Sequence, residues 1–128
     1  MLTVLIVDDE PNVVDLVRVT LEDERLHVLD APDAGTALDV LASVQPDVVL
    51  LDVNLPDMSG LDVCRRIRAD AVLARTKVVM LTAAAQREDI ERGRAVGADE
   101  YLTKPFSPVR LLSLIEELLP NAVLWARN

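Results

Sequence analysis

The sequence contains 128 residues, 51% of them hydrophobic, with a formal net charge of −9, which fits one domain with its own core and argues against direct nucleic-acid binding. Its single cysteine, Cys64, excludes an internal disulfide and fits a reducing cytoplasm. It shows no secretory signal pattern and no apolar run near the ~18 residues of a membrane span, so we expect a cytoplasmic domain without membrane contact.

Apolar runs of strand length alternate along the chain with apolar residues at helical spacing. Pro11 suits a first helical turn, Asp33 an N-cap and Gly97 a C-cap. In chain order the pattern predicts a strand at residues 3–7, a helix at 11–23, a strand at 27–30, a helix at 33–44, a strand at 47–51, a helix at 59–69, a strand at 77–81, a helix at 87–96, a strand at 99–102 and a helix at 107–119.

This alternation predicts an α/β fold, a doubly wound parallel sheet of five strands with five helices covering both faces. For five strands the common order is 2-1-3-4-5, with a crevice at the carboxyl ends where strands 1 and 3 meet. We expect residues 1–120 to form this domain. Residues 121–128 show no periodicity and are expected to be a C-terminal tail or the start of a linker.

Five residues suited to one chemistry follow these strands. Asp8 and Asp9 end the first strand, Asp52 ends the third, and Thr82 and Lys104 follow the last two. Three close carboxylates repel one another unless a cation lies among them, and Mg²⁺ prefers such oxygen ligands. With a lysine and a hydroxyl nearby, the set predicts a site that holds a phosphoryl group, with Asp52 as the nucleophile.

Each residue also has a simpler explanation. Asp8 and Asp9 could cap the following helix, Asp52 a turn, and Thr82 a helix N-terminus, while Lys104 could be a solvated surface lysine. Each of these explanations is the more common one when a residue is taken singly. The functional interpretation is favoured because all five residues fall on one rim of the predicted sheet.

The chain resembles the receiver domain of two-component response regulators, a flavodoxin-like fold of the chemotaxis-regulator type, from Leu2 to about Leu119. Several motifs in the expected order and spacing support this resemblance. They are Val7-Asp8-Asp9-Glu10, Asp52 with Leu55-Pro56-Asp57-Met58-Ser59-Gly60, Thr82-Ala83, Gly97-Ala98-Asp99-Glu100-Tyr101 and Lys104-Pro105-Phe106.

The resemblance implies a phosphorylation-activated signalling domain. Asp52 would accept a phosphoryl group from a histidine kinase or a histidine phosphotransfer protein. Asp9, Asp52 and the backbone carbonyl of Asn54 would ligate Mg²⁺, or Mn²⁺ in its place, and Asp8 would act mainly through water. Such a domain is no enzyme for other substrates, because it catalyses only its own phosphoryl transfer and autodephosphorylation.

The resemblance also implies a conformational switch. Thr82 and Lys104 would bind the phosphoryl oxygens, and Lys104–Pro105 would be a cis peptide. Thr82 would move towards the phosphate and Tyr101 would turn into the vacated space. The surface that reports this change would comprise residues 87–96, 99–102 and 107–119.

The switched surface would control a downstream effector domain or a target protein, and the family allows a phosphorylation-dependent dimer. Receivers fused to winged-helix domains often dimerise with a basic residue in the middle of the last helix. The basic residue of this last helix is Arg110, near its start, which argues against that mode of dimerisation.

Two other classes of protein compete with this interpretation. An aspartyl-phosphate phosphatase would have a second acid two residues after its nucleophile, where this chain has Asn54. A flavodoxin-like cofactor binder would have a glycine- or hydroxyl-rich loop after the first strand. The acidic run at Asp8–Glu10 would repel a phosphate there in the absence of a metal.

Overall fold

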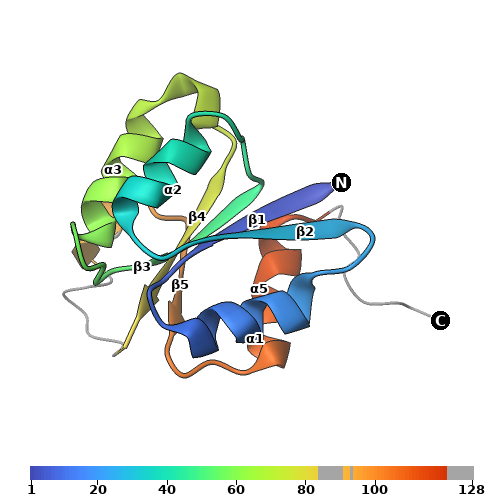
Figure 1. The fold of residues 1–128 in the computed structure, drawn as a ribbon. Coiled ribbons are helices and arrows are strands. Elements are labelled where there is room, and N and C mark those ends of the chain that lie inside the picture. Colours follow the sequence, from blue (N-terminus) through green and yellow to red (C-terminus); the bar gives the residue numbers. More distant parts are fainter. Residues whose placement is uncertain (84–90, 93, 121–128) are drawn as a thin grey trace.

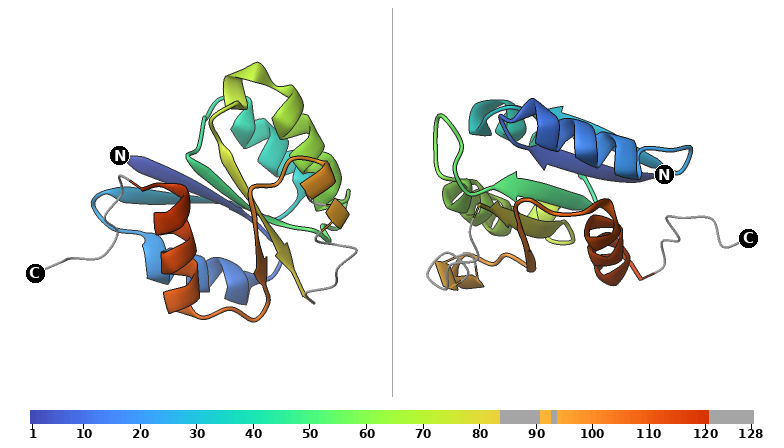
Figure 2. Two further views of the ribbon diagram at one scale, coloured as in Figure 1. Left: turned by 180° about the vertical axis from the view of Figure 1, so that it is seen from behind. Right: turned by 90° about the horizontal axis from the view of Figure 1, so that it is seen from below.

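A computed structural model describes residues 1–83, 91–92 and 94–120. Five parallel strands form one sheet in the order β2-β1-β3-β4-β5, with α1 and α5 on one face and α2 and α3 on the other (Figures 1 and 2). The elements are β1 (Leu2–Val7), α1 (Pro11–Leu21), β2 (Leu26–Ala31), α2 (Ala34–Leu41), β3 (Val48–Asp52), α3 (Gly60–Ala69), the 3₁₀ helix η1 (Ala71–Leu73), β4 (Lys77–Thr82), β5 (Glu100–Thr103) and α5 (Pro108–Leu118).

The predicted fold class and strand order are confirmed, with local differences at element ends. Four of the predicted helices have defined bounds, and the described residues 91–92 and 94–95 are helical within the predicted segment 87–96. Residues 84–90 and 93 of that segment lie outside the described residues. Helix α2 ends at Leu41 rather than near Val44, because its last turn tightens, with the N–H of Ser43 bonded to the carbonyl of Val40.

The core consists of two clusters, one on each face of the sheet. Along β1, Val4 and Ile6 join the cluster against α1 and α5, while Leu5 and Val7 join the cluster against α2 and α3. All four are fully buried. Burial on both faces of the sheet therefore explains why the strands are continuously apolar. Each fully buried leucine side chain stabilises the fold by about 1.5–3 kcal/mol relative to an exposed one.

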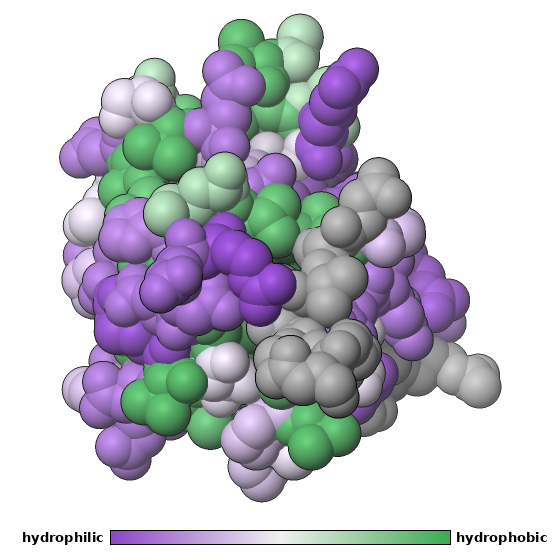
Figure 3. All heavy atoms as spheres, turned by 90° about the vertical axis from the view of Figure 1, so that its right-hand side faces the viewer, coloured by the Kyte–Doolittle hydropathy of each residue, from purple (hydrophilic) through white to green (hydrophobic). Residues whose placement is uncertain are grey.

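Hydrophobic residues also remain at the surface, but they are dispersed. Val19, Val72 and Val109 are exposed and belong to three different elements. On the face seen in Figure 3, small hydrophobic groups lie among hydrophilic residues. Among the described residues, no helix combines the length and apolar character that crossing a membrane requires.

The loop after β3 is fixed to two helices. Asp57 accepts hydrogen bonds through its two carboxylate oxygens from the N–H groups of Ala34 and Gly35, both at 2.9 Å, at the start of α2. These bonds, that from Ala34 first, lower the pKa of Asp57. The side chain of Ser59 accepts a bond from Leu61 N–H and caps α3.

Gly60 brings the start of α3 into contact with the end of β3. Its N–H donates to the carbonyl oxygen of Val53 at 2.7 Å. A Cβ at position 60 would overlap the backbone carbonyl oxygen of Asp52 and come within 2.9 Å of the carbonyl carbon. A side chain there would therefore displace backbone, which cannot yield as a flexible side chain can.

We expect Gly60→Ala to lower the free energy of unfolding by about 2 kcal/mol or more, because the added methyl group overpacks against the backbone of Asp52. Urea denaturation would measure the change. Gly35→Ala is the matched control, because it also lies at a helix start and its Cβ would stand 3.5 Å from Asp57 Oδ2, at ordinary contact distance. Equal destabilisation by the two substitutions would contradict the role given to Gly60.

Candidate functional site

Three acidic side chains converge at the carboxyl ends of β1 and β3. Asp8 follows β1 and is 1% exposed, and Asp52 ends β3 and is 6% exposed. Glu10 comes from the turn between β1 and α1. One carboxylate oxygen from each of these residues lies within 4.8 Å of the others, and we call Asp8, Glu10 and Asp52 the carboxylate cluster.

Lys104 places its ammonium group among these carboxylates. Its Nζ lies 2.7 Å from Asp8 Oδ2, 2.9 Å from Glu10 Oε1 and 3.2 Å from Asp52 Oδ2. Burial by itself would lower the pKa of Lys104, but the bonds to Asp8 and Glu10, together with the negative charges of Asp52 and Asp8, raise the pKa above its ordinary value. Lys104 is therefore held as a cation, and a single positive charge faces three carboxylates.

Asp52 is held by its own strand and by this lysine. Its Oδ1 accepts a hydrogen bond from the N–H of Asn54 at 3.1 Å. Burial raises the pKa of Asp52, and Asn54 opposes that rise; the charge of Asp8 raises the pKa further and Lys104 lowers it. The net effect is a raised pKa, which shows that the ionised carboxylate lacks full compensation and would gain from an added cation.

The ends of β4 and β5 complete the rim. Thr82 is buried at the end of β4, and its carbonyl oxygen accepts a hydrogen bond from the N–H of Lys104 at 2.7 Å. The Lys104–Pro105 peptide is cis. Because one residue carries both this backbone bond and the ammonium group, the position of Lys104 is linked to the end of β4.

Tyr101 lies on β5, where it pairs in register with Met80 of β4. The ring is partly buried and packs against the core cluster on the α2 and α3 face. The guanidinium carbon of Arg94 lies 5.9 Å from the ring centroid, within the range of a cation–π contact. Burial raises the pKa of the Tyr101 hydroxyl.

The structure thus brings together Asp8, Asp52 and Lys104 from the predicted set. Asp9 is exposed and lies outside the carboxylate cluster, and Asn54 is exposed in the loop after β3. Glu10 was missed as a site residue. Its position beside Asp8-Asp9 was the available signal, yet it stands at the N-cap of α1, and only the structure shows that its side chain makes no cap hydrogen bond.

The cluster fits a hard divalent cation. Its donors are all carboxylate oxygens, which Mg²⁺ and Mn²⁺ prefer, and their separation allows one ion to be shared. A cavity of about 390 Å³ opens beside Lys104. It is lined by Glu10, Asn12, Val13, Leu16, Ala83, Lys104, Pro105 and Phe106.

We expect Asp52→Asn to stabilise the metal-free protein at neutral pH by about 1 kcal/mol, because it removes a charge that folding places unfavourably. A raised pKa means that this cost is fully present above the folded-state pKa. It declines as the pH falls through that pKa and is absent below about pH 4, where the carboxyl is protonated in the unfolded chain too. Urea denaturation with a chelator, repeated across pH, would measure it.

Asp39→Asn is the control, because Asp39 is exposed on α2, and the same chemical change there should alter stability little. A destabilised Asp52→Asn variant at neutral pH would contradict the unfavourable charge.

The comparisons with known proteins agree with this geometry. The response regulator receiver domain family matches residues 4–116. The phosphate regulon transcriptional regulatory protein PhoB of Pseudomonas aeruginosa is 38% identical over 117 residues, which cover 91% of this chain and 51% of PhoB. The DNA-binding dual master transcriptional regulator RpaA of Synechocystis is 40% identical over 116 residues, 91% of this chain and 48% of RpaA. The chain spans about half the length of these curated relatives.

A solved structure resembles most of this chain. The chemotaxis response regulator CheY4 of Vibrio cholerae matches with a TM-score of 0.87 and 35% identity, covering 92% of this chain and 98% of that chain. The family match, the identity to two regulators and this structural likeness agree with one another. The chain belongs to the response regulator receiver domain family.

Proposed function

We propose that Asp52 is the phosphoacceptor of this receiver domain and takes a phosphoryl group from a histidine kinase or a histidine phosphotransfer protein. The observation that supports this most directly is its position, buried at the tip of β3 with Oδ2 3.2 Å from the Lys104 ammonium. A rigid carboxylate in a cationic environment suits an in-line phosphoryl transfer, because catalysis there is mostly positioning and charge neutralisation.

In the proposed step, a carboxylate oxygen of Asp52 forms a bond to phosphorus while the bond from phosphorus to the donor's imidazole nitrogen breaks. The electron pair of that bond leaves with the imidazole. Asp8, Asp9, Asp52 and the backbone carbonyl of Asn54 would hold Mg²⁺, or Mn²⁺, and the structure adds Glu10 to these candidates. A bound cation would neutralise the phosphoryl oxygens during transfer.

Lys104 would then exchange partners. Before transfer its ammonium contacts the carboxylate cluster, and after transfer it would contact a phosphoryl oxygen on Asp52. The hydroxyl of Thr82, at the neighbouring strand end, would donate to another phosphoryl oxygen. The domain would promote its own phosphorylation and its own autodephosphorylation, and no reaction on other substrates.

The proposed output is a change at Tyr101 and at the surface formed by residues 87–96, 99–102 and 107–119. Residues 87–90 and 93 of this surface lie outside the described residues. We further propose that residues 1–120 act as the receiver and that 121–128 are a tail or the start of a linker. The changed surface would control an effector domain or a target protein in the cytoplasm. A phosphorylation-dependent dimer is one form that this control could take.

We expect acetyl phosphate with Mg²⁺ to add one phosphoryl group to the wild type and none to Asp52→Asn, because an amide is a poor nucleophile. Intact-mass spectrometry would detect the addition, with a chelator sample as the metal-free control. Asp39→Asn, which removes an exposed carboxylate, should be labelled like the wild type. Equal labelling of Asp52→Asn would refute the assignment of the phosphoacceptor.

We expect Lys104→Ala to permit phosphorylation of Asp52 but to uncouple it from Tyr101, since the link between phosphate and strand end is lost. Tyr101 is the only tyrosine, so protein labelled with fluorotyrosine gives one ¹⁹F resonance to follow. The resonance should shift on phosphorylation in the wild type and remain in place in the variant. A normal shift in phosphorylated Lys104→Ala would show that the coupling takes another route.

A further inference from the structure

Strand β2 forms one edge of the sheet, and within the part of the chain that the structure describes its one strand partner is β1. An edge strand has backbone N–H and C=O groups directed away from its neighbour, and these can pair with a strand of another molecule. Proteins often block such pairing with proline or lysine in the edge strand itself. The sequence of β2 is Leu-His-Val-Leu-Asp-Ala, which contains neither.

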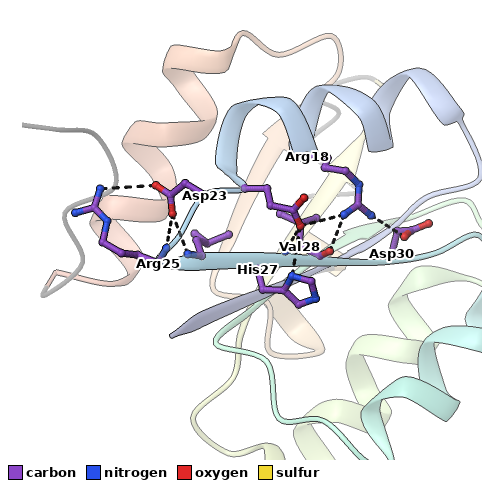
Figure 4. Close-up of polar contacts among 8 residues, drawn as sticks. Arg18, Asp23, Arg25, His27, Val28 and Asp30 are labelled. Atoms are coloured by element: carbon purple, nitrogen blue, oxygen red, sulfur yellow. Dashed lines mark hydrogen bonds and ion pairs between the residues drawn. The ribbon is translucent and has the colours of Figure 1, made fainter.

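Residues of α1 and of the turn after it cover this edge from outside. The N–H of Val28 donates to Glu22 Oε1 at 3.2 Å, and the carbonyl oxygen of Val28 accepts from Arg18 Nη1 at 2.9 Å. Two positions earlier, the N–H of Leu26 donates to Asp23 Oδ1 and its carbonyl oxygen accepts from the N–H of Asp23, both at 3.0 Å. The N–H and the carbonyl oxygen of both Leu26 and Val28 therefore already have partners in α1 or in the turn after it. Figure 4 shows Arg18 and Asp23 beside this strand.

The covering side chains also hold one another in place. Arg18 and Glu22, one helical turn apart, form an ion pair at 3.1 Å, and Arg18 Nη2 contacts Asp30 Oδ1 at 2.8 Å. His27 Nδ1 lies 3.4 Å from Glu22 Oε1. Ion pairs between such partly exposed side chains contribute little to stability. The position of these side chains along β2 is therefore better explained by the backbone groups of Leu26 and Val28 that they bond than by the stability that their ion pairs add.

We propose that Arg18, Glu22 and Asp23 form an edge cap that prevents β2 from pairing with β2 of a second copy of this chain. A second copy fits because two identical edges, related by a twofold axis, would meet antiparallel with the same groups on both sides. The six residues of β2 are enough for such a ladder, and its Leu26 and Val28 side chains already face the core, so the backbone is held extended.

The test is a double variant, Arg18→Ala with Glu22→Ala, which leaves the net charge at −9 because one charge of each sign is lost. Sedimentation analysis should show self-association about tenfold tighter than that of the wild type, the effect expected when a strand edge gains one or two net hydrogen bonds. The matched control is Asp62→Ala with Arg65→Ala, which removes an exposed ion pair of α3, a helix on the opposite face of the sheet from α1, and likewise keeps the net charge.

A second readout separates capping from general destabilisation. In dilute protein, the Val28 amide should exchange its hydrogen about tenfold faster in Glu22→Ala, because its acceptor is gone, whereas Glu22→Gln keeps an acceptor oxygen and should exchange and sediment like the wild type. If the double variant does not fold by circular dichroism, Glu22→Ala alone serves for both measurements. Self-association no tighter than in the control, or unchanged exchange at Val28, would overturn the proposal.

Discussion

The contact between Lys104 and the buried carboxylates is the constraint on which the rest of the site depends. Strands β1 and β3 place Asp8 and Asp52 side by side, out of water, where two negative charges are costly. One ammonium, at 2.7 Å and 3.2 Å from them, offsets only part of that cost. The raised pKa of Asp52 reflects the part of the cost that Lys104 does not offset. In the proposed chemistry, a bound cation would offset this remaining cost.

The same lysine connects this charge balance to the frame of the sheet. Its backbone N–H bonds the carbonyl of Thr82, while its side chain reaches the carboxylate cluster. A new charge on Asp52 would therefore act on a residue that is anchored at the end of β4 and followed by the β5–α5 loop. Tyr101 lies three residues earlier on β5, so a short path joins the site to the proposed output surface.

Sequence patterns predicted the features that follow from the spacing of apolar residues and from which residues end the strands. Continuous apolar runs predicted a sheet buried on both faces, and the order of parallel strands placed Asp8, Asp52 and Lys104 on one rim. Patterns could not predict that the carboxylate of Glu10, rather than that of Asp9, contacts Lys104. In a turn, the directions of adjacent side chains follow no period. The bonds of Asp57 to the start of α2 join residues 22 and 23 positions apart and have no periodic signal.

The charged residues of this domain divide by burial, and burial decides what each group can do. Breaking a buried ion pair costs several kcal/mol because a charge is left uncompensated, whereas an exposed pair is worth about 0–1 kcal/mol. Asp8 and Asp52 of the carboxylate cluster belong to the first class, and their incomplete compensation by Lys104 makes them responsive to a cation or a phosphoryl group. The proposed edge cap belongs to the second class, because its ion pairs are partly exposed, and these pairs therefore contribute little to the free energy of folding.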